Sequence, residues 1–144
     1  DAGVVAARRR HDRAFLIELC ASIASRYAEL HAHGVIHGDV HAGNIIAGNV
    51  IDGTGRITLI DFGYACISGE PPRLGRAGVL SYVEPEFFAS HPPAEAGEQY
   101  ALAALLYFLI TGSHYLDFRS DRGEMQRQIE HDPPLPFAQQ QPVQ

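Results

Sequence analysis

The sequence contains no lysine and no tryptophan, and it has only two cysteines, Cys20 and Cys66, among its 144 residues. Two cysteines do not make a disulfide framework, so we expect both to be free thiols. No run approaches the roughly 20 uninterrupted apolar residues that span a bilayer, and no transmembrane segment is predicted. The first residues also lack the basic-then-apolar order of a signal peptide. These absences predict a cytoplasmic location.

The net charge of the chain is −6, with 46% hydrophobic and 19% charged residues. This balance argues against nucleic acid as the main partner, because nucleic-acid-binding domains carry basic patches. The length and apolar content are those of one soluble domain that can bury a hydrophobic core. Because the sequence begins at Asp1 with no initiator methionine, we expect it to be an excerpt of a longer chain.

Three segments have the patterns of helices. Between residues 15 and 30, apolar residues recur every three or four positions, which predicts a helix with one buried face. Residues 98–111 are apolar on all sides, as in a helix that lies in the interior. Residues 122–130 are mostly polar and predict a short surface helix.

The remaining segments are shorter or irregular. Strand-like runs at 44–46 and 57–60 flank a turn rich in glycine, which predicts a small β-hairpin. Residues 64–77 contain two glycines and two prolines, and we expect a loop with little regular structure. Residues 132–144 form a tail rich in proline and glutamine, which predicts an extended or disordered segment.

Two short motifs indicate phosphoryl transfer. The first, at residues 37–44, reads HGDVHAGN and places Asp39 and Asn44 in a loop of small residues. The second is Asp61-Phe62-Gly63, directly after the strand-like run. Transfer of phosphate from a nucleotide needs a carboxylate near the acceptor hydroxyl and oxygen ligands for Mg²⁺. Asp39, Asn44 and Asp61 are residues of these types.

The two motifs resemble the catalytic loop and the metal loop of protein kinases, HRDxxxxN and DFG, with Gly38 in place of the arginine. Residues 78–86 are similar to the end of a kinase activation segment, and residues 98–112 to the buried central helix of the C-terminal lobe. The resemblance implies a mainly α-helical C-lobe over residues 1–131, with a small hairpin between the two loops and the tail at 132–144. The implied catalytic loop is 37–44, the metal loop 61–63 and the activation segment 61–86, with the buried helix at 98–111.

The same resemblance implies roles for five residues. Asp39 would act as the catalytic carboxylate, and His41 stands where Ser/Thr kinases usually have a lysine beside the transferred phosphoryl group. Asn44 and Asp61 would hold Mg²⁺ and the ATP phosphates, and Ile46 would lie under the adenine ring. From the residues alone, each could instead be structural: Asp39 and Asn44 in turns, His41 in a local hydrogen bond and Ile46 in the core.

Other residues of the motifs are expected to be structural. We expect the ring of His37 to pack against Phe62 and to bond a backbone group. Glu98 replaces the usual aspartate of the buried helix, and its carboxylate could bond the backbone of the catalytic loop. Glu86 resembles a glutamate that pairs with an arginine of the C-lobe. The candidate partners of Glu86 are Arg119, Arg122 and Arg127.

Two departures from the kinase pattern bear on the activity. Kinases hold the α- and β-phosphates with an N-lobe lysine, and this chain has no lysine, so we expect that it lacks the N-lobe or makes that contact with another group. Val79 stands where Ser/Thr kinases have a threonine, and Gly38 removes the arginine that an activation-loop phosphate neutralises. We therefore do not expect a phosphorylation switch, and the acceptor could differ from an ordinary protein substrate.

The resulting prediction is the C-lobe of an ATP- and Mg²⁺-dependent kinase that phosphorylates a hydroxyl, on Ser or Thr of a protein or peptide. The pattern is similar to the bacterial kinase domains of class III and IV lanthipeptide synthetases. The N-lobe would precede Asp1 in the same parent chain, and the segment by itself would be inactive. Two alternatives share the motifs: a small-molecule kinase of the aminoglycoside or choline type, and a pseudokinase-like binding scaffold. A metal hydrolase would instead use His37, Asp39 and His41 as ligands.

Overall fold

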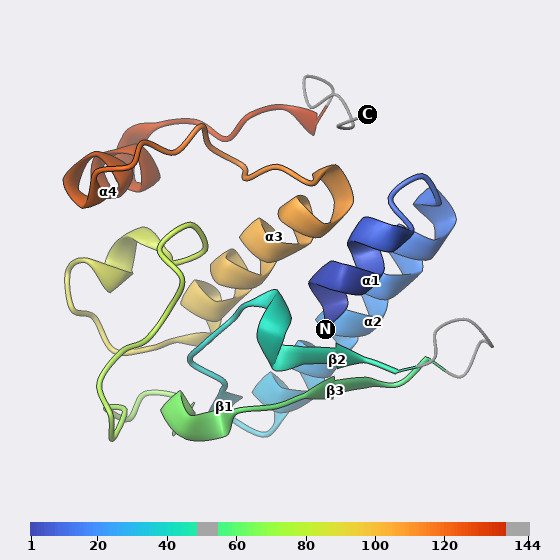
Figure 1. Cartoon of the computed structure of the whole chain (residues 1–144). Coiled ribbons are helices and arrows are strands. Elements are labelled where there is room, and N and C mark those ends of the chain that lie inside the picture. Colours follow the sequence, from blue (N-terminus) through green and yellow to red (C-terminus); the bar gives the residue numbers. More distant parts are fainter. Residues whose placement is uncertain (49–54, 138–144) are drawn as a thin grey trace.

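The computed structural model describes residues 1–48 and 55–137. Among these residues helices predominate over strands, as expected, but there are two small antiparallel sheets where one hairpin is predicted. The elements are arranged as shown in Figure 1. The α-helices are α1 (Ala2–Arg8), α2 (Arg13–Ala32), α3 (Glu95–Thr111) and α4 (Arg122–His131). The strands are β1 (Val35–Ile36), β2 (Ile45–Ala47), β3 (Ile57–Leu59) and β4 (Cys66–Ile67). Short 3₁₀ helices are η1 (Ala42–Asn44), η3 (Phe62–Tyr64) and η4 (Pro85–Phe87).

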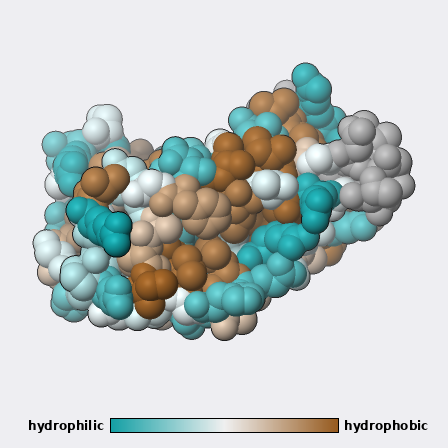
Figure 2. Space-filling model, turned by 90° about the horizontal axis from the view of Figure 1, so that it is seen from below, coloured by the Kyte–Doolittle hydropathy of each residue, from teal (hydrophilic) through white to brown (hydrophobic). Residues whose placement is uncertain are grey.

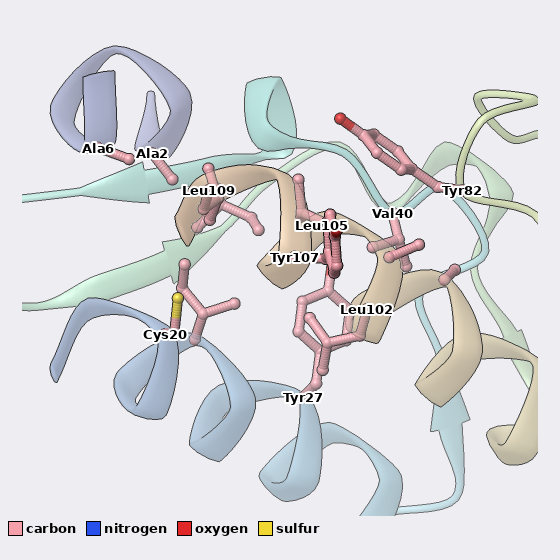
Figure 3. Close-up of a cluster of buried hydrophobic side chains, with 14 of the residues drawn as sticks. Ala2, Ala6, Cys20, Tyr27, Val40, Tyr82, Leu102, Leu105, Tyr107 and Leu109 are labelled. Carbon is pink, nitrogen blue, oxygen red and sulfur yellow. The ribbon is translucent and has the colours of Figure 1, made fainter. Parts of the chain in front are cut away.

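Helices α2 and α3 form the core of the molecule. Figure 3 shows side chains of α3 directed toward α2, where Cys20 and Tyr27 lie. Leu105 and Leu109 of α3 are almost fully buried, as is Ile23 of α2. The interior position predicted for the helix at 98–111 is therefore confirmed, and the helix begins three residues earlier than predicted, at Glu95.

The predicted hairpin is present as the pair β2–β3, in which Ile45 lies opposite Leu59. Its predicted turn falls on residues 49–54, outside the described part of the chain. The loop predicted at 64–77 is wrong at its beginning, because β4 pairs with β1 and places Ile67 opposite Val35. A two-residue strand formed with a segment some 30 positions away leaves no local pattern from which it could be predicted.

Helix α1 was not predicted, since seven residues are too few for a periodic pattern. Asp1 caps it by accepting a hydrogen bond from the backbone N–H of Val4 at 2.9 Å. Ala2 and Ala6 are fully buried, and Figure 3 shows them on the side of α1 that faces the core. The small side chains allow α1 to lie close to α3 and to the η1–β2 segment.

After α4 the chain returns to α3. The backbone N–H of Leu135 donates to the carbonyl of Tyr115 at 2.8 Å, and the hydroxyl of Tyr107 donates to the carbonyl of Leu135 at 3.0 Å. The ring of Phe137 lies 4.6 Å from that of Tyr107. The predicted division into a domain ending at residue 131 and a tail remains a prediction, and residues 138–144 lie outside the described part.

No helix of the described residues is both long and apolar enough to cross a membrane. Cys20 is buried and Cys66 half-buried, and both are free thiols, as expected. Burial raises the pKa of Cys20 to about 11, which keeps its thiol neutral.

Tyr27 provides a test of the core. Its hydroxyl is buried and finds no hydrogen-bond partner among the described residues. A buried unpaired hydroxyl costs free energy, so Tyr27→Phe should raise the free energy of unfolding by about 1 kcal/mol. Tyr27→Ala should lower it by about 3–5 kcal/mol, because it leaves a cavity. Urea unfolding of the three proteins checks both values, and a loss of stability in Tyr27→Phe would mean that the hydroxyl has a partner.

Candidate active site

The predicted catalytic loop (residues 37–44), between β1 and β2, is held together by Asn44. Its side-chain amide donates two hydrogen bonds to Asp39, one to the backbone carbonyl at 3.0 Å and one to the carboxylate Oδ2 at 3.2 Å. Asn44 is buried, whereas the side chain of Asp39 remains 17% exposed. With its amide nitrogen occupied, Asn44 can present its Oδ1 oxygen to a cation.

His41 lies beside the same carboxylate. Its Nε2 is 3.4 Å from Oδ2 of Asp39, and its Nδ1 accepts a hydrogen bond from the backbone N–H of Gly43 at 3.1 Å. A ring whose Nδ1 is an acceptor carries its proton on Nε2, which here faces Asp39. A Cβ on Gly43 would lie 2.9 Å from Cε1 of His41, so only glycine allows this close approach without a shift.

The metal loop begins directly after β3, next to Asn44. The backbone N–H of Ile60 donates to the carbonyl of Asn44 at 3.0 Å, and this bond places Asp61 beside the catalytic loop. Asp61 has left-handed backbone angles, φ 59° and ψ 70°, which are uncommon for a residue other than glycine. Its exposed carboxylate accepts a bond from the N–H of Gly63 at 3.4 Å. Asp61 and Asn44 thus offer oxygen ligands of the kind that Mg²⁺ prefers.

His37 links the catalytic loop to the metal loop. Its Nε2 donates to the carbonyl of Ile60 at 2.9 Å, and its ring lies 4.7 Å from that of Phe62. The predicted structural role of His37 is therefore confirmed. Its Nε2 is occupied by the carbonyl of Ile60, and no cluster of three or more His, Cys, Asp or Glu in the described ranges could hold a metal ion. The arrangement required for the metal hydrolase is not present there.

The carboxylate of Glu98 anchors the catalytic loop to α3. Its Oε1 accepts the backbone N–H of Gly38 at 2.8 Å, and its Oε2 accepts that of His37 at 3.1 Å. The predicted bonding of Glu98 to the loop backbone is therefore confirmed. His31 of α2 donates from Nε2 to the same Oε2 at 2.7 Å. The side chains of Glu98 and His31 are 2% and 9% exposed, so this is a buried pair.

Gly38 allows the segment after the metal loop to approach the catalytic loop. Its φ is +82°, and a Cβ at this position would collide with the backbone carbonyl of Tyr64. A side chain therefore does not fit here without movement of the backbone.

Ile46 lies on β2 opposite Thr58 and is 41% exposed. Ile60 and Phe62, which follow β3, are also substantially exposed. Figure 2 looks at the molecule from below Figure 1 and shows apolar side chains gathered in the middle of this face, with polar ones around them. An exposed apolar residue beside the two loops is compatible with contact to a nucleotide base.

Two partners of buried acids were missed by the sequence analysis. His31 follows Ile23 and Tyr27 at intervals of four on the buried side of α2, and this spacing could have indicated it. Arg76 forms a buried ion pair with Glu84, whereas none of the predicted arginines pairs with Glu86 in the described residues. Glu86 is exposed and Glu84 buried, so the expected pairing of Glu86 is wrong. No local pattern indicates the contact of Arg76 with Glu84, because it depends on the path of the intervening loop.

Comparison with known proteins identifies the matching family. A family model described as the protein kinase domain matches residues 6–141. The DNA damage-responsive serine/threonine-protein kinase RqkA of Deinococcus radiodurans is 31% identical over 121 residues, which are 81% of this chain and 18% of that protein. Serine/threonine-protein kinase PkaB of Streptomyces coelicolor is 36% identical over 104 residues, 67% of this chain and 25% of its own length. Serine/threonine-protein kinase PknF of Mycobacterium tuberculosis is 33% identical over 100 residues, with 67% and 21% covered. The chain thus spans 18–25% of the length of these three relatives.

The role of Glu98 can be tested by stability. Glu98→Gln removes the negative charge that accepts the N–H groups of His37 and Gly38 and pairs with His31. We expect the free energy of unfolding to fall by about 3 kcal/mol in urea denaturation, because a buried pair is broken. Glu95→Gln, in the first turn of the same helix, is the matched control and should cost about 0.5 kcal/mol or less. Equal losses in the two variants would contradict the anchoring role.

Proposed function

Because the chain belongs to the protein kinase family, we propose that it forms the C-terminal lobe of an ATP- and Mg²⁺-dependent kinase. The acceptor is a hydroxyl, on Ser or Thr of a protein or peptide. The observation that carries the proposal is the arrangement of Asp39, Asn44 and Asp61. The amide of Asn44 donates to Asp39, and the backbone N–H of Ile60, the residue before Asp61, donates to the carbonyl of Asn44. The serine/threonine kinases among the relatives support this acceptor class.

Asp39 orients the acceptor hydroxyl and takes its proton. Its Oδ2 already faces two donors, Nδ2 of Asn44 at 3.2 Å and Nε2 of His41 at 3.4 Å. The other oxygen, Oδ1, accepts no hydrogen bond from the described residues and is free for the acceptor hydroxyl. A carboxylate held in this way places the hydroxyl for attack and accepts its proton as the new bond forms.

Asn44 and Asp61 hold the metal and the phosphates. Their amide and carboxylate oxygens lie at adjacent ends of the β2–β3 hairpin and suit a hard cation. When bound, Mg²⁺ supplies positive charge that offsets the charge of the transferred phosphoryl group. Ile46 contributes an apolar surface for the adenine ring.

His41 replaces the lysine of typical Ser/Thr kinases and serves as a donor rather than a fixed cation. In the tautomer set by Gly43, its Nε2–H faces Asp39. The same replacement occurs in small-molecule kinases, which are the second candidate function. The narrower likeness to lanthipeptide synthetases remains a prediction, as do the cytoplasmic location and the lack of nucleic-acid partners.

The central test is phosphoryl transfer from labelled ATP with Mg²⁺, in the full-length protein and in its Asp39→Asn variant. We expect the variant to lose about 10²–10⁴-fold in kcat, because it cannot accept the proton, while Mg-ATP binding persists. Asp117→Asn, an exposed aspartate between α3 and α4, is the control and should retain full activity. Absence of transfer in the unmodified protein, with Mg-ATP binding intact, would favour the binding scaffold.

A second test concerns the missing half of the nucleotide site. Residues 1–144 expressed alone should transfer no phosphate, because no lysine is present to hold the α- and β-phosphates and the apolar face of Figure 2 would be uncovered. The full-length protein, assayed at the same concentration, is the control. Turnover by the short polypeptide above that of its Asp39→Asn variant would refute the dependence on an N-lobe.

A further inference from the structure

Arg76 lies in the segment between β4 and η4, and its guanidinium contacts three points further along the chain. Nη2 forms an ion pair with Glu84, and Nη1 donates to the backbone carbonyl of His91 at 3.1 Å. The guanidinium carbon lies 5.0 Å from the centre of the Phe87 ring. The side chain of Arg76 therefore ties the beginning of the segment 76–91 to its middle and its end.

The ion pair is buried against α3. The side chains of Glu84 and Arg76 are 6% and 19% exposed. A Cβ on Gly97 would lie 2.7 Å from Oε1 of Glu84, so the carboxylate rests on bare helix backbone at this position. A buried carboxylate without a partner is strongly unfavourable, and Arg76 supplies the opposite charge. The pair thus fixes the segment to the helix that also carries Glu98.

The pair and the catalytic loop share one small cavity. Its volume is about 30 Å³, and its lining includes Arg76, Glu84 and Val79 on one side and Gly38 and Glu98 on the other. A cavity of this size holds one or two water molecules. A shift of the Arg76–Glu84 pair would therefore open the space directly behind Gly38, whose N–H is held by Glu98.

Nothing in this arrangement requires a phosphate. Between residues 64 and 78 the only hydroxyl side chains are those of Tyr64 and Ser68, and position 38 is a glycine rather than an arginine. The negative charge opposite Arg76 is supplied by the chain itself, through Glu84.

We propose that the Arg76–Glu84 pair is a permanent clamp, which holds the segment 76–91 against the catalytic loop without phosphorylation. Arg76 is thereby a positioning residue for the acceptor, which contacts the exposed Val79 side of this segment. The inference rests on the proposed kinase function, because it names the part of the site that receives the protein or peptide hydroxyl.

The kinetic test uses the full-length protein and a generic serine/threonine peptide as acceptor. Arg76→Gln should raise the KM for the peptide about tenfold and leave the KM for ATP within about twofold, since only the acceptor side is released. Arg73→Gln changes an exposed arginine three residues before Arg76; it is the matched control and should change neither value. Treatment of the unmodified protein with a phosphatase should also leave the peptide KM unchanged.

Hydrogen exchange tests the clamp without reference to activity. The N–H groups of Tyr82, Phe87 and His91 are bonded within the segment, so their exchange reports its order. Arg76→Gln should accelerate exchange across 79–91. The double variant Arg76→Gln/Glu84→Gln should exchange more slowly than the single one, because no buried charge is left unpaired.

The possible outcomes distinguish a failure of the clamp proposal from a failure of the proposed kinase function. Exchange in Arg76→Gln equal to that in Arg73→Gln would refute the clamp, whether or not the protein transfers phosphate. Faster exchange with equal rises in the KM for peptide and for ATP would refute the positioning role. A rise in peptide KM after phosphatase treatment would refute independence from phosphate. If the unmodified protein transfers no phosphate, the proposed function fails, and the exchange experiment alone decides the clamp.

Discussion

The carboxylate of Glu98 lies where α3, α2 and the catalytic loop meet, and the geometry of the candidate site depends on it. Its two oxygens accept the backbone N–H groups of His37 and Gly38 and the Nε2–H of His31. These donors come from a loop and a helix that are 60 to 67 residues away in the sequence. A single buried charge thus sets the path of the chain just before Asp39, because moving the loop would leave that charge without its donors.

Short hydrogen-bonded links connect this anchored part of the catalytic loop to the other residues of the candidate site. His37 connects the catalytic loop to the metal loop by donating a hydrogen bond to the carbonyl of Ile60. Asn44 connects to Asp39 by donating to its carboxylate. Each link uses a polar group of the backbone or a short side chain, so the linked residues have little freedom to move relative to one another. Asp39 and Asp61 therefore stand on a rigid base while their carboxylates remain at least partly exposed to solvent.

The segment 76–91 rests on the same helix through a second buried acid. Glu84 sits against Gly97 in α3, one residue before Glu98, and is balanced by Arg76. Two neighbouring positions of one helix thus support the catalytic loop and the following segment separately. The partners of the two acids, His31 and Arg76, both precede them in the sequence, His31 by 67 residues and Arg76 by 8.

The sequence by itself determined the α2 and α3 helices, the hairpin and the order of the motifs, because apolar periodicity and loop chemistry are local properties. It also indicated that His37 is structural and that Glu98 bonds the loop. Only the tertiary structure decided the partners of the buried acids, since an ion pair such as Arg76–Glu84 depends on how a loop folds back in space. The tertiary structure also decided the β1–β4 pairing and the close approach of Tyr64 to Gly38. Each of these contacts joins two segments whose separation is set by the packing of the whole chain.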